Sequence, residues 1–493
     1  MLNLEKIKWL NKNTGFFRFK PFWNDYLITN DIAKHAFLTK KEFGDFIMWK
    51  ITEWEKYEEL LNRWFIKNDK YKASMALAYA KKNEFLWYGP SLHIIVTTLR
   101  CNHKCQYCHA AVAPMSAKEM DMTEKTAKKV VDTIFYTSNP SLTIEFQWWE
   151  ALVNWNVVKY IVEYAETKAV HLKKNLSFAL VTNLTLMDDE KLDYIIDHNI
   201  WLSTSLDWDE ETHNFNRTFK DWNSFEQVTY WIKKINKRFE VEWIKQKIWA
   251  LLTVSKRTLS KYKEVIDTYV ELGLDWIFLR PLNPYGFAAA DLEKLWYEPE
   301  EFIEFYKKSM DYIIELNKKW IKFREAMSWI YLSKILTDKD PNYLDERSPC
   351  WACIWQVAYN FDWKIYSCDE GRMLGRMWDD NFKMWKLEET WEETYKKMID
   401  SETTKIMVQA STLDWLPWYN DSVYKPYIWV CPIHSYKSTG NIIPNYSKDE
   451  KRILGHSILD YLFENIRIEE NKNIFKDWLG MGDNSVTSQC ESI

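Results

Sequence analysis

The stretch HIIVTTLRCNHKCQYCHA, residues 93–110, decides the fold and the chemistry of this chain. An apolar run typical of buried parallel strands leads directly into a loop that carries Cys101, Cys105 and Cys108. In α/β folds the functional groups gather at the carboxyl ends of such strands. The three thiols therefore stand where a site is expected.

The spacing of these cysteines favours one kind of metal centre. A structural zinc site closes with four ligands, and no fourth cysteine lies close to the three in the sequence. Three thiolates on one loop instead suit a 4Fe-4S cluster whose fourth iron stays open to a small molecule. Zinc and redox-active thiols are the alternatives.

The strand-and-helix alternation continues to about residue 285. Five more apolar runs follow, each separated from the next by an amphipathic helical pattern: LTIEFQ, LSFALVTNL, LSTSLD, ALLTVS and IFLRPL. Six such repeats predict an α/β barrel or a doubly wound sheet. Short aromatic strands and charged helices before residue 80 predict a separate α+β module.

Charge and hydropathy narrow the classes of partner. Lys and Arg number 66 against 71 Asp and Glu, so nothing favours a nucleic-acid partner. No apolar run reaches membrane-spanning length and the first residues lack a signal-peptide pattern, so we expect a cytoplasmic protein with no membrane partner. Eight cysteines in a reducing compartment favour ligands over disulfides.

Tryptophan and glycine usage is abnormal. The chain has 29 tryptophans and 11 glycines, whereas average usage predicts roughly 35 glycines. Asp-Trp pairs occupy turn-like places at 207–208, 275–276, 362–363 and 414–415, and Trp155 lies between two asparagines. We hypothesise that many of these tryptophans are glycines, encoded by UGA codons that some bacteria read as glycine. A genuinely Trp-rich surface is the alternative.

The cysteine loop resembles the CxxxCxφC signature of radical S-adenosylmethionine (SAM) enzymes, with Tyr107 as the aromatic residue. The resemblance implies a partial (β/α)6 barrel over residues 90–320 and a 4Fe-4S cluster on Cys101, Cys105 and Cys108. The open iron would bind SAM, and one electron would cleave SAM to a 5'-deoxyadenosyl radical.

Further SAM contacts follow from the same resemblance. The family's Gly-Gly-Glu-Pro motif aligns with Trp148, Trp149, Glu150 and Ala151. A side chain at either glycine position would fill the space that the ligand occupies. His213 fills a further family position. The other implied contacts stand at strand ends: Asn183, Ser205, Arg217 and Arg280. Each polar residue alone could equally be a loop cap or a surface ion pair.

A second cysteine group resembles SPASM domains, which hold auxiliary iron-sulfur clusters. The C-x9-W-x4-C pattern matches their signature if Trp363 is glycine. Over residues 340–470 the resemblance implies a loop-rich domain with one auxiliary 4Fe-4S cluster on Cys350, Cys353, Cys368 and Cys431. A second auxiliary cluster is predicted absent, since Tyr419, Ser422 and Ile428 replace its cysteines. We expect Cys490 to be a free thiol in a disordered tail, residues 478–493.

Long segments are similar to the radical SAM maturase of the His-Xaa-Ser peptide system, among them DPNYLDERSPC and CDEGRMLG. This implies modification of a ribosomally made precursor peptide, with a second radical SAM partner and an external electron donor. The module of residues 1–85 would bind the peptide's leader by strand addition.

Three alternatives remain open. The chain could be another SPASM enzyme, such as an anaerobic sulfatase maturase. It could be a non-catalytic iron-sulfur protein, if Trp148 and Trp149 are genuine and overpack the pocket. A nucleic-acid-modifying radical SAM enzyme is disfavoured by the balanced charge.

Overall fold

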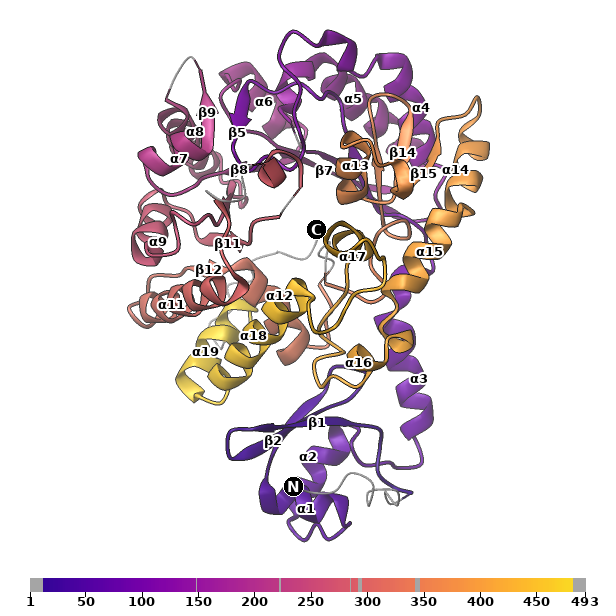
Figure 1. The fold of residues 1–493 in the computed structure, drawn as a ribbon, viewed down its shortest axis with the longest axis vertical. Helices are drawn as coiled ribbons and strands as arrows, with labels where there is room; N and C mark the ends of the chain where they lie inside the picture. Colours follow the sequence, from indigo (N-terminus) through magenta and orange to yellow (C-terminus); the bar gives the residue numbers. More distant parts are fainter. Residues whose placement is uncertain are drawn as a thin grey trace.

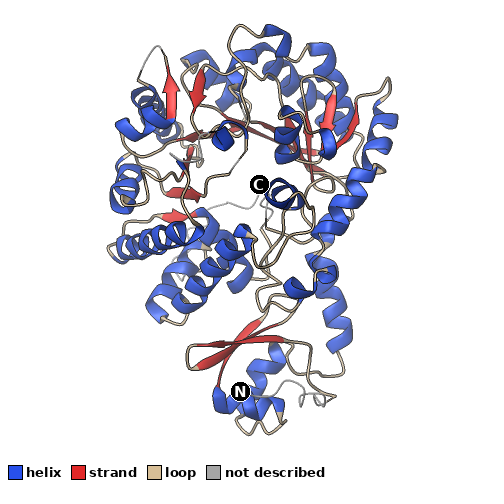
Figure 2. Ribbon diagram, viewed as in Figure 1, coloured by secondary structure: helices blue, strands red, loops and turns tan. Residues whose placement is uncertain are grey.

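One large sheet organises the molecule (Figures 1 and 2). The computed structural model describes residues 12–147, 149–220, 223–283, 285–290, 295–341 and 346–481. Within them a ten-stranded sheet has the order β12-β11-β10-β8-β7-β6-β4-β13-β14-β15. Its six central strands are mutually parallel: β4 Leu92–Ile95, β6 Ser141–Phe146, β7 Asn175–Val181, β8 Ile200–Ser205, β10 Trp249–Thr253 and β11 Trp276–Arg280.

Helices follow these strands and cover the outer face of the curved sheet, as Figure 2 shows. They are α4 Glu124–Ile134, α5 Trp155–Leu172, α6 Asp189–Asp197, α7 Glu210–Asn216, α8 Ser224–Val241, α9 Tyr262–Glu271 and α11 Pro299–Lys318. In α4, Thr123 caps the first turn and Val130, Val131 and Ile134 face the core. The predicted partial (β/α)6 barrel is confirmed.

The cysteine-bearing segment joins the same sheet, which the sequence did not predict. Strand β13, Gln356–Tyr359, pairs parallel with β4, and β14, Lys364–Tyr366, and β15, Lys383–Lys386, continue the edge antiparallel. At the opposite edge β12, Arg324–Glu325, extends β11. The expected division between residues 320 and 340 therefore does not divide the sheet.

The remaining helices surround this segment. They are α12 Ala326–Leu336, α13 Asp369–Arg376, α14 Trp391–Ile399, α15 Glu402–Ser411, α16 Pro417–Asn420, α17 Pro432–Thr439, α18 Glu450–Asn465 and α19 Glu469–Trp478. Two expected boundaries are wrong here. Residue 470 falls inside α19, and Trp478, the expected start of the tail, ends that helix with its indole buried.

The first part of the chain forms a small module with its own core (Figure 1). An antiparallel sheet has the order β1-β2-β3, from β1 Arg18–Phe22, β2 Asp25–Thr29 and β3 His35–Thr39. Helices α1 Lys40–Ile47, α2 Trp54–Asn62 and α3 Tyr71–Lys82 follow. Phe43, Phe46 and Leu60 pack against the sheet, as the aromatic and charged patterns indicated.

Tryptophan occupies an unexpected backbone conformation. Nine tryptophans of the described residues have positive φ: Trp23, Trp49, Trp64, Trp149, Trp208, Trp243, Trp320, Trp363 and Trp378. Such a backbone strains any residue with a Cβ and suits glycine. Among the tryptophans that the sequence placed in turns, Trp208 and Trp363 have the positive φ that glycine favours. Trp276, which begins β11, and Trp155, which begins α5, do not.

Five of these tryptophans share one structural place. Trp49, Trp64, Trp243, Trp320 and Trp378 each stand immediately after the C-cap of a helix, where a left-handed glycine usually ends the helix. Gly273 and Gly480 occupy the same position after α9 and α19. Trp243, Trp320 and Trp378 are at least 89% exposed, so packing does not hold these indoles.

Within the described residues, no helix combines the length and the apolar character that crossing a membrane requires.

Candidate functional site

The loop after β4 is closed by an ion pair. Arg100 binds Asp121 through two nitrogens, and its third nitrogen donates to the carbonyl of Met115. Arg100 also forms a β-bridge with Ala113. The cysteine loop is thus tied at its base, so its thiols hold their positions.

The three loop cysteines are half-buried and close enough to influence one another. Burial, and then its neighbours Cys105 and Glu150, raises the pKa of Cys101 well above its usual value. Burial likewise raises the pKa of Cys105 to about 12, although Arg217 opposes the shift. Neutral thiols here would lose their protons only against a positive centre, as metal binding supplies.

Hydrogen-bond donors point at the sulfurs. Burial raises the pKa of Cys108, but the backbone N–H groups of Val112, Ala110 and Ala111 hydrogen bond its sulfur and oppose that shift. The N–H of His103 donates to Cys101 Sγ over 3.4 Å. Hydrogen bonds to sulfur stabilise the thiolates that ligate iron-sulfur clusters.

Gly286 shows that the loop after β11 touches the cysteine loop. A Cβ at Gly286 would lie 2.6 Å from the Cys108 carbonyl oxygen, and its φ of +56° also favours glycine. The next N–H, of Phe287, donates to that oxygen over 2.8 Å. Only glycine allows this approach.

Trp149 lies in the expected ligand space. Its indole is 8% exposed and packs in one cluster with Cys101 and Cys108, as the sequence interpretation expected for a literal tryptophan. Its φ is +75°, and its indole nitrogen is buried with no partner among the described residues. Trp148 lies outside the described residues. As written, residue 149 does not fit a ligand beside the thiols.

Glu150 and Asn183 connect two strand ends to the loop. Glu150 is fully buried and its carboxylate accepts hydrogen bonds from Leu152, Thr182 and Asn183. Burial raises its pKa to about 7. Asn183 Nδ2 donates to Asn102, 2.8 Å away, and lies 3.9 Å from Cys101 Sγ. Asn183 therefore lies beside the Cys101 sulfur, and Glu150 holds the backbone of Asn183 in place.

Tyr107 and Arg217 engage Asp207. The Tyr107 hydroxyl donates to this buried carboxylate, Arg217 Nε lies 3.2 Å from it, and Arg217 lies 5.2 Å from the Tyr107 ring. Strand β9, Arg217–Phe219, also pairs Arg217 with Cys105 of β5, His103–Cys105. Arg217 therefore links the cysteine loop at Cys105 to the buried Asp207.

His213 and Ser205 close this part of the site. His213 is buried, accepts the N–H of Asp207, and contacts Ser224. These contacts make it a structural histidine. Ser205 is the last residue of β8, half-buried at the strand end where the sequence placed it.

Three residues near the loop were missed in the sequence. Burial, and then Asp369, raises the pKa of Glu145 to about 7, against the effect of Arg280. His109 lies near Arg280 and Asp369 as well, and burial lowers its pKa to about 3. The predicted Arg280 thus lies close enough to Glu145 and His109 to influence both electrostatically, and Asp369 influences the same two groups. No motif marks this grouping, because it joins two strands to the start of α13.

Two of the second-group cysteines begin helices. Cys368 caps α13 and its sulfur accepts the N–H of Gly371; Cys431 caps α17 and accepts the N–H of His434. The positive end of a helix favours a thiolate. Burial, and then Glu370, Asp369, Cys350 and Cys431, raises the pKa of Cys368.

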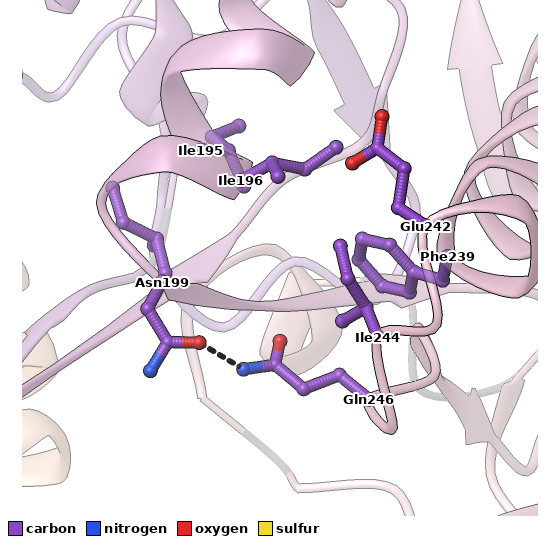
Figure 3. A pocket seen from close by; sticks show the side chains of 8 residues that line it. Ile195, Ile196, Asn199, Phe239, Glu242, Ile244 and Gln246 are labelled. Carbon is purple, nitrogen blue, oxygen red and sulfur yellow. Dashed lines mark hydrogen bonds between the residues drawn. The ribbon is translucent and has the colours of Figure 1, made fainter.

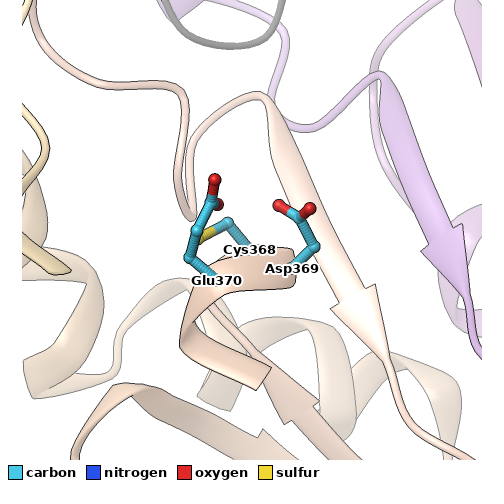
Figure 4. A group of neighbouring side chains, drawn as sticks. All are labelled: Cys368, Asp369 and Glu370. Carbon is cyan, nitrogen blue, oxygen red and sulfur yellow. The ribbon is translucent and has the colours of Figure 1, made fainter. Parts of the chain in front are cut away.

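All four second-group cysteines are buried. Cys353 has a φ of +72° and its thiol hydrogen bonds Thr404, while burial raises its pKa to about 12. Ligand atoms of Cys368, Asp369 and Glu370 lie within 4.8 Å of one another, so this thiol has two carboxylates beside it (Figure 4).

The remaining predictions concern the three residues that replace the cysteines of a second auxiliary cluster, and Cys490. Tyr419 donates to Asp449 over 2.5 Å, Ser422 contacts His456, and Ile428 is buried. Absence of a second auxiliary cluster stays a prediction. Cys490 lies outside the described residues.

A pocket of about 250 Å³ lies away from this chemistry (Figure 3). Its lining includes Phe239 and the hydrogen-bonded pair Asn199 and Gln246, beside the start of β8. This is the amino end of the parallel sheet, whereas the cysteine loop follows the carboxyl end of β4. Catalysis in α/β folds takes place at the carboxyl end.

Comparison with known proteins finds a family match whose range includes the cysteine loop. Residues 95–266 match the Radical SAM superfamily. The cysteine-type anaerobic sulfatase-maturating enzyme of Clostridium perfringens is 23% identical over 295 residues, a match covering 57% of this chain and 74% of that enzyme. The radical SAM cyclopropyl synthase TigE of Paramaledivibacter caminithermalis is 23% identical over 141 residues, 26% of this chain and 29% of TigE.

Solved structures share the fold. Native anSMEcpe with bound AdoMet superposes with a TM-score of 0.61 at 16% identity, covering 78% of this chain and all of that one. Streptococcus suis SuiB bound to precursor peptide SuiA superposes with a TM-score of 0.50 at 12% identity, covering 89% and 100%.

Proposed function

Because this chain is a member of the radical SAM superfamily through residues 95–266, we propose that it is a SAM-cleaving maturase of a ribosomally made peptide. The observation that carries this proposal is the tied loop of Cys101, Cys105 and Cys108 at the carboxyl end of β4, with Asn183 beside Cys101. A 4Fe-4S cluster bound there would supply the electron that splits SAM into methionine and a 5'-deoxyadenosyl radical.

The chain's own residues prepare the site. Arg100 and Asp121 fix the loop, and Arg217 and Asp207 support it under Cys105. Glu150 holds the ends of β6 and β7 together through Thr182 and Asn183. Ser205 and Arg280 stand at two further strand ends, where SAM and substrate would approach.

Glycine at 148 and 149 is part of this proposal. The indole at 149 packs on Cys101 and Cys108, so a ligand needs its removal. The positive φ shared by nine tryptophans, five of them at helix ends, supports recoding of UGA as glycine. Sequencing the gene tests it: UGG codons at 149, 243, 320 and 378 would overturn the recoding.

The auxiliary site is proposed on Cys350, Cys353, Cys368 and Cys431. Helix N-termini lie at Cys368 and Cys431, and their positive ends would favour the thiolate form of a metal-bound sulfur. A buried cluster there would accept the electron that the substrate radical loses when it becomes the oxidised product, or would hold the peptide.

We further propose a His-Xaa-Ser repeat peptide as the substrate, with a second radical SAM enzyme and an external electron donor as partners. The likeness to SuiB, which was solved with a precursor peptide, supports a peptide substrate. The β1-β2-β3 module would bind the leader along a sheet edge.

Sulfatase maturation is the second candidate, favoured by the match over 57% of the chain. Both candidates can be tested in one assay. Protein with glycine at 148 and 149, purified without oxygen, is given SAM, reductant and either a His-Xaa-Ser peptide or a cysteine-bearing sulfatase peptide. A mass change in only the first supports the main proposal. A change in only the second would replace it.

A further inference from the structure

Glu145 carries a carboxylate that the chain leaves without a hydrogen bond. It stands on β6 with its side chain partly exposed. Among the described residues no group hydrogen bonds this carboxylate, and the causes that shift its pKa are burial, Asp369 and Arg280. A desolvated acceptor without a donor costs stability. A donor that arrives with a ligand would remove that cost.

Other carboxylates of the same sheet accept several hydrogen bonds. Glu150, which follows β6, is fully buried and accepts from three groups. Glu325 in β12 is also fully buried and accepts from four groups, one of them the Tyr306 hydroxyl. The chain therefore supplies donors to the acids that hold strand ends and loops together. Glu145 lacks such donors, which points to a role toward a ligand.

The alternation of β6 places Glu145 on the face of the sheet away from the helices. Its neighbours Ile144 and Phe146 are buried in the core cluster that contains Val130 of α4 and Val158 of α5. Successive side chains of a strand point to opposite faces. The Glu145 carboxylate therefore lies on the face that α4 and α5 do not cover.

The neighbours of Glu145 on that face are small or apolar. In the parallel register Glu145 lies opposite Ile94 of β4 and Ala179 of β7, and Ala358 of β13 lies opposite Ile94. Paired residues of adjacent strands share a face, and none of these three side chains has a hydrogen-bond donor. Glu145 is thus a single acceptor on an apolar surface, an arrangement typical of sites for small organic groups.

The charges around Glu145 restrict the kind of donor. Arg280 acts on Glu145 electrostatically, so it disfavours a permanent cation such as an ammonium or a guanidinium, while Asp369 disfavours an anion. A neutral imidazole donates one N–H and has an apolar ring edge that can pack on Ile94 and Ala179. These properties favour a histidine side chain.

We propose that Glu145 determines specificity by accepting a hydrogen bond from a histidine side chain of the substrate peptide. This inference rests on the proposed function, since it takes a His-Xaa-Ser repeat peptide as the substrate. It adds the residue that recognises the histidine. A serine hydroxyl, the other side-chain donor that every repeat contains, is too small to cover the apolar neighbours of Glu145.

The experiment measures peptide affinity without reductant, so that no step of the reaction enters the measurement. Glu145→Ala and Glu145→Gln are compared with the parent and with Glu190→Ala, a control that removes an exposed carboxylate of α6. All proteins carry glycine at 148 and 149. Calorimetric titration uses three peptides: an intact His-Xaa-Ser repeat, a repeat with alanine for histidine, and a repeat with alanine for serine.

Glu145→Ala should weaken binding of the intact repeat about tenfold, because the imidazole loses a charged acceptor. Glu145→Gln should weaken it about threefold, since the amide oxygen still accepts but carries no charge. Glu190→Ala should bind like the parent. With the histidine-free repeat all four proteins should bind equally, because the interacting partner is already absent. With the serine-free repeat the loss in Glu145→Ala should remain.

Three results overturn the proposal: equal affinity of the parent and both Glu145 variants for the intact repeat, a loss that persists with the histidine-free repeat, and a loss that vanishes with the serine-free repeat. If Glu145→Ala does not fold, as a thermal melt would show, Glu145→Gln decides. An unchanged affinity in Glu145→Gln then overturns the inference.

A further arm separates this inference from the proposed function. If the parent binds none of the peptides, the proposed substrate fails. Free imidazole then replaces the peptide, and its binding is followed by nuclear magnetic resonance. Imidazole that binds the parent more tightly than Glu145→Gln supports the recognition of a histidine side chain by Glu145, and equal binding overturns it.

Discussion

The two cysteine sites differ in the burial of their thiols and in the spacing of their cysteines along the chain. Cys101, Cys105 and Cys108 are half-buried on one loop at a strand end. Cys350, Cys353, Cys368 and Cys431 are buried and come from distant segments, two of them as helix caps. The first set is therefore partly exposed, whereas the second set is enclosed by the chain. Under the proposed function, the first site would bind a small molecule and the second would hold a closed centre.

The largest effect should come from the open site. Cys105→Ser removes a proposed cluster ligand. The residue opposite it in the β5–β9 pair is Arg217, which cannot replace a thiolate. SAM cleavage, measured as 5'-deoxyadenosine, should fall to the background of the reductant alone. Cys490→Ser, which belongs to neither set, is the matched control and should keep full activity. SAM cleavage by the Cys105→Ser protein would contradict the proposed difference between the two cysteine sites.

The closed site should respond differently. Cys368→Ser removes a proposed cluster ligand, although a serine can still cap α13, and iron should fall from about eight to about four per chain while the loop cluster remains. SAM cleavage without peptide should persist, and peptide modification should be lost. Iron counting and the two assays check this. A parent protein with only about four irons would contradict the second centre.

Between the sites, Glu145 should make stability depend on pH. Its pKa is raised to about 7 from 4.5 by burial, then by Asp369. The stabilising contribution of the neutral acid is therefore complete below pH 4.5 and is lost as the pH rises through 7. Relative to Glu145→Gln, the metal-free protein should lose about 1–2 kcal/mol of unfolding free energy from pH 5 to 8. Thermal melts at several pH values test this, and parallel curves would rule it out.

The smallest effect should come from Asn183. Asn183→Ala removes the hydrogen bond to Asn102 and the contact with Cys101, at a cost of about 1 kcal/mol. The cluster should remain, and the affinity for SAM should fall about tenfold or less. Calorimetric titration with SAM measures the change. Asn175→Ala, at the opposite end of β7, should leave the affinity unaltered.

Local patterns predicted much of the fold. Each of the six parallel strands overlaps an apolar run seen in the sequence and begins one or two residues before it, and the cysteine loop follows the first of them. The pairing of β13 with β4 was not predictable, because two apolar segments so far apart carry no signal of their register. The same holds for the grouping of Glu145, Arg280 and Asp369.

The tryptophans show the same limit. Composition and Asp-Trp pairs indicated glycine, and Trp208 and Trp363 adopt the left-handed backbone that glycine prefers. Trp276 carries the same sequence signal but begins a buried strand and stacks on Trp249. An Asp-Trp pair therefore predicts a turn only where its second residue is not part of a β-strand.

SAM cleavage by the natively produced protein tests the central claim most directly. The protein, made in its own host and purified without oxygen, is reduced with SAM present, and 5'-deoxyadenosine and methionine are quantified. The account predicts both products in equal amounts, together with iron bound to the chain. An iron-loaded protein that leaves SAM intact after reduction would contradict it.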